Sequence, residues 1–427
     1  MNNLFSKTLK NFEPWFGAYA ILGAVASGLI PILLPLWTQS HSGAAQVGIV
    51  MALFGLGQLS APLWGEIADL MKLNRLLFLI GLIVIGFSLL GIVFISYPWS
   101  LGLLSLFAGL GFSLTNTLAN LWIVERFLFD QLSERVGFLQ RTYGIGQVAG
   151  LAVAGALSVT HLKIALLVSA LMPFLALAFF HTMPVMPGSG NFKLRPALSD
   201  IHPKIQPLIA SMSQSYHLLH IKDTIKHLSK SSKSTILFNT LWFIMTMGSA
   251  FLFSFYPIIM KNVYYINPGI SSTVFAVAAA LGIFLYAPSG NLSEKYNNQT
   301  VLLWGLVMRI ISLAGLTILA CIKFTGGELL VIMFFILTVL SWPVISVTGT
   351  AIAAESNLPK GAAMGLFSAN NALALTAGSL VGGFLAHVFG YYILPLFGMF
   401  FLIATFFLGI KLINEDKNLK NTNEKST

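Results

Sequence analysis

The chain has 427 residues, of which 56% are apolar and only 9% charged, and its formal net charge is +10. Soluble domains carry roughly 25% charged residues, so this composition excludes a soluble enzyme, a disordered chain and a coiled coil. One spanning helix takes about 20 apolar residues, and twelve would take about 240. The composition therefore predicts a multi-pass membrane protein.

Apolar runs predict six spans in the first part of the chain, at 15–37, 45–66, 75–96, 99–122, 136–158 and 162–182. A polar central loop follows at 183–235. Six further spans are predicted at 236–260, 269–289, 301–322, 327–350, 362–386 and 389–412, with a tail at 413–427. The predicted fold is an all-α membrane protein of twelve transmembrane helices, with one six-helix bundle in 1–182 and a second in 236–412.

The positive charges lie in the gaps between spans and predict the orientation. One set of gaps is rich in lysine and arginine, and the central loop alone holds Lys193, Arg195, Lys204, Lys222, Lys226, Lys230 and Lys233. The alternate gaps hold only Lys163, Lys261 and Lys323. Cytoplasmic loops collect lysine and arginine, so both termini and the central loop are expected in the cytoplasm. The net charge thus reflects topology, and no nucleic-acid partner is predicted.

Two matching segments indicate an internal repeat. Residues 137–157, at the fifth span, align without gaps with 365–385, at the eleventh, through shared glycine, alanine, valine and leucine positions. The segment 61–69 after the second span also resembles 287–294 after the eighth. Both matches occur in the same order, which predicts that the two bundles are parallel repeats.

The segment after the second span reads Gly65-Glu66-Ile67-Ala68-Asp69-Leu70-Met71-Lys72-Leu73-Asn74-Arg75. It resembles the loop motif of the major facilitator superfamily, in which glycine and aspartate four residues apart precede basic residues; Lys72 stands where the family usually has glycine. The resemblance implies a transporter whose halves lock together on the inside in the outward-open state. The predicted gate residues are Gly65, Asp69, Lys72, Arg75, Gly290 and Glu294, with Arg126, at the inner end of the fourth span, as a possible charge partner. The alternative is that Asp69 and Glu294 are solvated loop acids.

The first span contains Pro31 and Pro35 within Ile30-Pro31-Ile-Leu-Leu-Pro35-Leu-Trp37. This segment resembles the proline-rich first span of the drug-exporter-like branch of the family, which implies export. Prolines inside a helix remove a backbone hydrogen bond and bend the helix, so this span is expected to curve along a cavity.

Polar side chains inside the spans are expected to face inward, because an amide that faces lipid is costly. Packing between helices is the alternative to ligand contact for each of them. Arg141 either extends to the interface or meets an anionic substrate, whereas Arg309 is expected to be structural or to extend to the interface. The candidate cavity residues are Gln58, Asn116, Asn120, Arg141, Tyr143, Gln147, Asn239, Trp242, Tyr256, Trp342, Asn370 and Asn371.

No acidic residue falls near the middle of any predicted span. The single cysteine and the spacing of the histidines suggest no metal site. No cofactor is therefore predicted, and a proton gradient is the candidate energy source. The absence of a carboxylate at mid-membrane leaves proton coupling without an assigned residue.

The leading prediction is a secondary transporter that exports a small organic molecule, such as a drug, siderophore or metabolite. Uptake of a metabolite or siderophore is the close alternative, since one fold serves both directions. A membrane enzyme would need a nucleophile–base or metal constellation, which the spans do not suggest, and a channel or non-transporting sensor is the third class. The protein is expected to act as a monomer in the lipid bilayer, with the bacterial inner membrane as its location.

Overall fold

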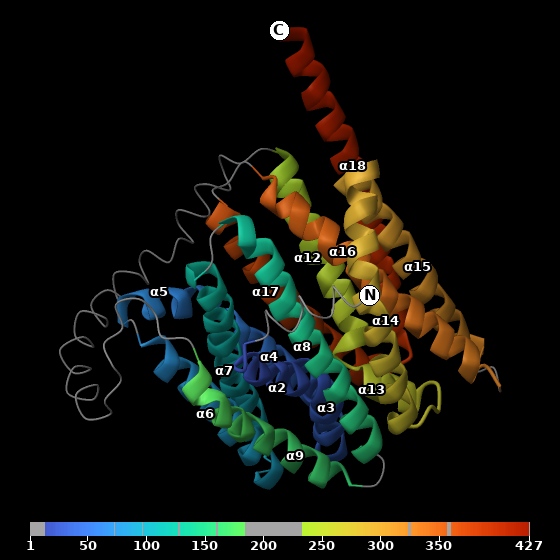
Figure 1. Ribbon diagram of the computed structural model, residues 1–427. Helices are drawn as coiled ribbons and strands as arrows, with labels where there is room; N and C mark the ends of the chain where they lie inside the picture. Colours follow the sequence, from blue (N-terminus) through green and yellow to red (C-terminus); the bar gives the residue numbers. More distant parts are fainter. Residues whose placement is uncertain are drawn as a thin grey trace, which may run out of the picture.

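The computed structural model describes residues 13–71, 73–95, 97–126, 129–158, 161–183, 233–322, 326–356 and 360–426. Throughout these residues the ordered elements are helices, and no strand occurs among them. Figure 1 shows the helices of the first half, in blue to green, beside those of the second half, in yellow to red. The predicted central loop lies, from 184 to 232, outside the described residues.

The first half contains six spans. The first consists of α2 (Phe16–Gly23), the π-helical turn η1 (Ala24–Leu29) and α3 (Ile30–His41). The second consists of α4 (Ala44–Gln58) and α5 (Ala61–Met71). The others are α6 (Asn74–Phe94), α7 (Pro98–Arg126), α8 (Phe129–Leu157), and α9 (Leu162–Leu175) with the 3-10 helix η2 (Ala176–Thr182).

The second half repeats this layout. Its first span consists of α12 (Lys233–Phe253) and α13 (Tyr256–Asn262). The others are α14 (Pro268–Tyr296), α15 (Asn298–Ile322), α16 (Glu328–Ala354), α17 (Lys360–Phe389) and α18 (Ile393–Ser426). The segment 413–426, predicted as a tail, continues α18 as helix, which extends beyond the rest of the molecule (Figure 1).

Prolines interrupt the first two spans. Pro31 has no backbone N–H, and the turn before it is π-helical, with the N–H of Ile30 donating to the carbonyl of Val25. Pro62 likewise cannot donate to the carbonyl of Gln58, which instead accepts a hydrogen bond from Oγ of Ser113 at 3.2 Å. The second predicted span is therefore two helices, separated by a turn at residues 59–60.

Eleven of the described helical segments are long and apolar enough to cross a membrane. The twelfth span is α8, with 29 residues. Polar residues such as Gln140, Arg141 and Gln147 lower its hydropathy, but α8 packs between α2 and η1 on one side and α14 on the other. The described helices thus form twelve spans in two six-helix bundles, as predicted.

Interactions between helix ends identify one face of each bundle. Arg126, at the end of α7, forms an ion pair of 2.5 Å with Glu13, just before α2. Lys233, at the start of α12, pairs with Glu415 of α18 at 3.0 Å. We call the face where α2 and α12 begin and α7 and α18 end the terminal side, and the other face the opposite side.

Three helix pairs join the bundles: α4 with α17, α8 with α14, and α3 with α13. Within the bundles, α4 and α6 pack on α7, while α12 packs on α17 and α18, and α16 packs on α14 and α15. The buried core is mainly apolar, with large side chains such as Trp15, Trp122 and Phe335 fully enclosed, and it also contains hydroxyl side chains and Arg309.

Candidate functional site

On the opposite side, α4 and α17 cross with their backbones in contact. A methyl group built at Gly48 would lie 2.7 Å from Cα of Gly383, and one built at Gly383 would lie 2.7 Å from Cα of Gly48. Further along, a methyl group at Gly55 would lie 2.9 Å from Oγ1 of Thr376. Any larger residue would force these helices apart, so glycine makes the crossing.

The opposite side is also closed between α8 and α14. A methyl group at Gly155 would lie 2.8 Å from Oγ1 of Thr273 and 3.1 Å from the carbonyl oxygen of Gly269. A hydrogen bond completes the closure, because Oη of Tyr391 donates to Oε1 of Gln39 between the second and first halves.

The same helix pairs separate toward the terminal side. Continuing the antiparallel register of the crossing between α4 and α17 brings Gly65 of α5 to the level of Gly365. Among the described residues, a methyl group at Gly365 would meet no atom within 4 Å. In the described part of the chain, the one atom that a methyl group at Gly65 would meet is Cγ2 of Thr117, in its own bundle, at 4.0 Å.

The pair α8 and α14 shows the same difference between its two ends. The register between α8 and α14 brings Gly137 to the level of Gly290, and in the described part of the chain neither would place a methyl group within 4 Å of another atom. Among the described residues, the glycines on the opposite side are thus in contact across the bundle interface, whereas the corresponding glycines on the terminal side are not.

A polar cluster in the first bundle joins α2, α7 and α8. Tyr19 donates from its hydroxyl to Oδ1 of Asn116 at 2.7 Å. Asn120 donates to the carbonyl of Asn116 at 2.8 Å, and Gln140 donates to Oδ1 of Asn120 at 3.4 Å. The ring of Tyr143 lies 5.1 Å from that of Tyr19. The cluster therefore links candidates predicted separately on two spans.

Helix α8 presents its part of this cluster toward the gap between the bundles. Gly146 packs on Ala20 of α2, and a methyl group built at Gly144 would lie 3.5 Å from Cδ1 of Ile283 of α14. At 100° per residue, the predicted residues Tyr143 and Gln147 fall on the arc between these two contacts. The exposed Ile145 lies on the other face of the helix.

A second polar cluster joins α12 and α17 in the second bundle. Trp242 donates from Nε1 to Oδ1 of Asn371 at 2.7 Å, and Thr246 donates to the same atom at 3.3 Å. Asn370 donates to the carbonyl of Asn239 at 2.7 Å and is 9% exposed. The two clusters occupy corresponding places, since each joins the first and fifth spans of its bundle.

The remaining candidates are scattered. Gln58 ends α4, where its carbonyl is used by Ser113. Arg141 is exposed on α8. By helical spacing it lies on the side that faces α14 and carries the exposed Ile145, away from Tyr143. Trp342 on α16 is 37% exposed. The structure therefore does not bring these three side chains into either cluster.

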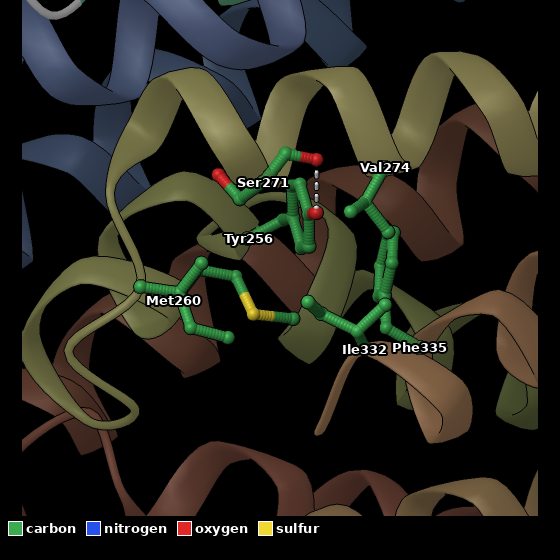
Figure 2. A pocket seen from close by; sticks show the side chains of 7 residues that line it. Tyr256, Met260, Ser271, Val274, Ile332 and Phe335 are labelled. Carbon is green, nitrogen blue, oxygen red and sulfur yellow. Dashed lines mark hydrogen bonds between the residues drawn. The ribbon is translucent and has the colours of Figure 1, made fainter. Parts of the chain in front are cut away.

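Tyr256 lies in the core of the second bundle. Its ring stacks on Phe335 at 4.0 Å and meets Phe275 edge-on at 5.4 Å. Its hydroxyl donates to the carbonyl of Ser271 at 2.7 Å, as Figure 2 shows. The small pocket around it is lined mainly by apolar side chains, with Met260 on one side (Figure 2). At 1% exposure, Tyr256 packs helices rather than facing the gap between the bundles.

The predicted gate residues are placed in part. Lys72 and the side chain of Asp69 lie outside the described residues. Arg75 donates to the carbonyl of Met183 within the first bundle, and Glu294 is exposed near the end of α14. Arg126 pairs with Glu13.

Arg309 is the buried charge that sequence reasoning underestimated. Of the two roles expected for it, extension to the interface is wrong, because its side chain is fully buried and points into the second bundle. The signal was available, since an arginine in the middle of an apolar span is a functional candidate by default. No cluster of metal-ligating side chains occurs among the described residues.

The model of the major facilitator superfamily matches this chain over residues 15–360 and 243–427. Comparison with curated proteins finds no match. Among solved structures, the nucleoside transporter NupG is 14% identical, with 94% of this chain and 97% of that chain covered and a TM-score of 0.72. A mutant of a peptide transporter, POT, in complex with sulfate is 13% identical, with 95% and 94% covered and a TM-score of 0.68.

A D-xylose–proton symporter is 14% identical, with 95% of this chain and 97% of that chain covered and a TM-score of 0.63. At such low identity these structures establish the fold alone, whereas the family model spans nearly the whole chain. The chain therefore belongs to the major facilitator superfamily, and it is a multi-pass membrane transporter rather than an enzyme.

Proposed function

We propose that this protein exports a small organic molecule by alternating access, with its terminal side in the cytoplasm of a bacterial cell and its spans in the inner membrane. The observation that carries the proposal is the asymmetry of the bundle interface. Backbone contact at Gly48 and Gly383 closes one side, while Gly65 and Gly365 stand apart on the other. Together with the positive-inside distribution of lysine and arginine, this corresponds to a cavity open to the cytoplasm.

Closure of the cytoplasmic side is the other half of the proposed cycle. Gly65 and Gly365 would then approach as Gly48 and Gly383 do now, and Gly137 would approach Gly290. We assign Asp69, Lys72, Arg75, Arg126 and Glu294 to the charge network that holds this closed state, as the family resemblance implies. Glu294 is on the face of α14 that carries Ile283, the residue in contact with α8, which supports its assignment.

The proposed substrate contacts come from the two polar clusters. In the first bundle these are Asn116, Asn120, Tyr143 and Gln147. In the second it is Asn371, which the fully buried Trp242 holds in place through its indole N–H. The hydroxyl and amide groups of these residues recognise neutral hydrogen-bonding parts of a ligand, and the surrounding aromatic rings contact its apolar body. Asn239, Asn370 and Tyr256 are assigned to helix packing.

A flux assay tests the function. The full-length chain is reconstituted into liposomes loaded with a panel of fluorescent or radiolabelled organic molecules, and loss from the lumen is measured against protein-free liposomes. A pH gradient and an electrical potential are imposed separately, since similarity to a proton symporter makes the proton a candidate coupling ion. We expect protein-dependent loss of at least one compound and saturation with concentration.

Direction is tested in cells. Expression should lower the cellular content of the transported compound, and the variant Gly48→Leu, which disrupts closure of the opposite side, should restore it. Higher cellular content on expression would contradict export and favour uptake. Absence of flux for every compound of the panel would contradict transport itself.

A further inference from the structure

A complete positive charge lies in the middle of the second bundle. Arg309 is near the centre of α15, and its side chain has 0% exposure. Its Nε donates to Oγ of Ser341 at 2.9 Å, and its Nη1 donates to Oγ of Ser249 at 3.0 Å. A longer bond of 3.4 Å reaches the carbonyl of Thr338. The guanidinium thus ties α15 to α12 and α16.

These partners give each guanidinium nitrogen one acceptor without cancelling the charge. Each acceptor is a hydroxyl or carbonyl oxygen, and two aromatic rings complete the shell, with Trp342 centred 5.5 Å and Phe253 5.9 Å from the guanidinium carbon. A charge held this way costs several kcal/mol relative to water. Because an arginine is costly at this position, we expect it to have a use beyond packing.

Trp342 separates this charge from the gap between the bundles. On α16, Met333 and Leu329 are 57% and 67% exposed and mark the lipid-facing side. Trp342 follows Met333 by about two and a half turns, which places it on the other face of the helix. Its 37% exposure is therefore toward the interior, and the indole ring lies between that interior and the guanidinium, with its centroid 5.5 Å from the guanidinium carbon.

The arginine site also adjoins the polar cluster of the second bundle. Ser249 follows Thr246 by three residues on α12, and residues at that spacing share one helix face. Thr246 contacts Asn371 at 3.3 Å, while Ser249 contacts Arg309 at 3.0 Å. The proposed substrate contact Asn371 is thus linked to the buried charge through Thr246 and Ser249 of α12.

The acidic residues of the chain lie elsewhere. All 14 are in the loops, in the termini or toward the ends of the spans, such as Glu294, Glu328 and Glu415. The charge of Arg309 therefore meets no mid-membrane carboxylate supplied by the sequence. A negatively charged ligand would supply the missing charge.

We propose that Arg309, screened by Trp342, makes the cavity selective for organic anions, with a carboxylate as the recognised group. This inference rests on the transport function proposed above and names the substrate class of the same cavity. A ligand stacked on the far face of the indole would lie about 9 Å from the guanidinium, given a stacking distance of about 3.5 Å. At an effective dielectric constant of about 20, that charge favours a monoanion over its neutral analogue by about twentyfold.

The negative charge of such a substrate would also allow the membrane potential to drive its export. The cytoplasm is electrically negative, so an exported monoanion moves down the membrane potential. Export of such a substrate requires no proton-carrying carboxylate at mid-membrane, in agreement with the positions of the acidic residues.

The experiment compares matched pairs of organic molecules, each pair consisting of a carboxylate and its primary amide. Flux from liposomes containing the full-length chain is measured at pH 7, with potentials of either sign imposed by potassium and valinomycin. We expect the carboxylates to move at least tenfold faster than their amides, and faster still when the potential favours anion exit. Arg309→Gln should reduce that ratio to about twofold or less, whereas Arg309→Lys should keep it above about fivefold.

Lys163→Gln is the matched control, because it also removes one positive charge but at an exposed position on α9; it should leave the ratio unchanged. Faster flux of the amides, or a carboxylate preference that survives in Arg309→Gln, would overturn the inference while leaving transport intact. No flux of either member of any pair would contradict the transport function as well. Even if Arg309→Gln fails to fold, the comparison of carboxylate with amide flux in the wild-type protein tests whether organic anions are preferred.

Discussion

Gly48 and Gly383 hold the two bundles together on the opposite side, with no room for a side chain between them. A methyl group on either would lie 2.7 Å from the Cα atom of the other. Close crossing of this kind is available to glycine because it has no Cβ. The two halves must separate here if the proposed cavity is to open outward, so we expect this contact to form and break during the transport cycle.

Replacement of one of these glycines should prevent this contact from forming. Gly383→Leu is expected to lower transport by more than tenfold, because the closed state of the opposite side can no longer form, while each bundle still folds. Flux in liposomes measures the loss, and an intact elution profile in detergent measures folding. Gly43→Leu is the control, since no atom lies within 4 Å of a methyl group there. Normal flux in Gly383→Leu would contradict the assignment.

Tyr391 and Gln39 provide a weaker and more adjustable contact. Tyr391→Phe removes one hydrogen bond, worth about 1 kcal/mol, and should shift the equilibrium about fivefold toward the open opposite side. The shift can be read, in a chain with Cys321→Ser, from the labelling rate of a cysteine introduced at Ala44, which is 8% exposed and lies at the crossing with Gly383, with and without Tyr391→Phe. An unchanged labelling rate would show that the bond does not stabilise closure.

The same bond predicts a pH response. Burial raises the pKa of Tyr391 above the ordinary value for tyrosine, which is about 10. The closed state therefore holds the phenolic proton more tightly than a state in which Tyr391 is exposed. Closure should be constant between about pH 6 and 9 and should weaken as the pH rises above about 10. In Tyr391→Phe this component of the pH response should be absent, as measured by the same labelling assay.

Asn371 organises the polar cluster of the second bundle. Asn371→Leu removes the acceptor of Trp242 and leaves a buried indole N–H unpaired, which should cost about 1–3 kcal/mol and lower the unfolding temperature in detergent. Asn371→Asp keeps an acceptor and should retain more stability than the leucine variant. Asn262→Leu, at an exposed position on α13, serves as the control. Equal unfolding temperatures for all three variants would contradict the role of the cluster.

The sequence predicted the architecture well because lipid imposes a simple rule, about 20 apolar residues for each span. The twelve spans, the two bundles and the helical class are confirmed. The breaks at residues 24–29 and 59–60 were harder to place, since proline marks a disturbance without specifying whether a π-helical turn or a new helix results.

The site was predictable only in part. Polar residues inside spans could be named, and Asn116, Tyr143, Trp242 and Asn371 do belong to clusters. The sequence could not distinguish them from Tyr256, because the inward face of a span includes both the bundle core and the gap between bundles. Extension of Arg309 to the interface stayed open for a similar reason, since depth along a helix does not reveal the direction of a side chain.

Alternating access requires that the terminal side closes while the opposite side opens. In a chain with Cys321→Ser, the pair Gly65→Cys and Gly365→Cys is oxidised during transport, and flux is measured before and after reduction. We predict that a disulfide forms, that it stops flux, and that reduction restores it, whereas the pair Gly43→Cys and Gly365→Cys forms no crosslink. Continued flux through the fully crosslinked protein would contradict alternating access.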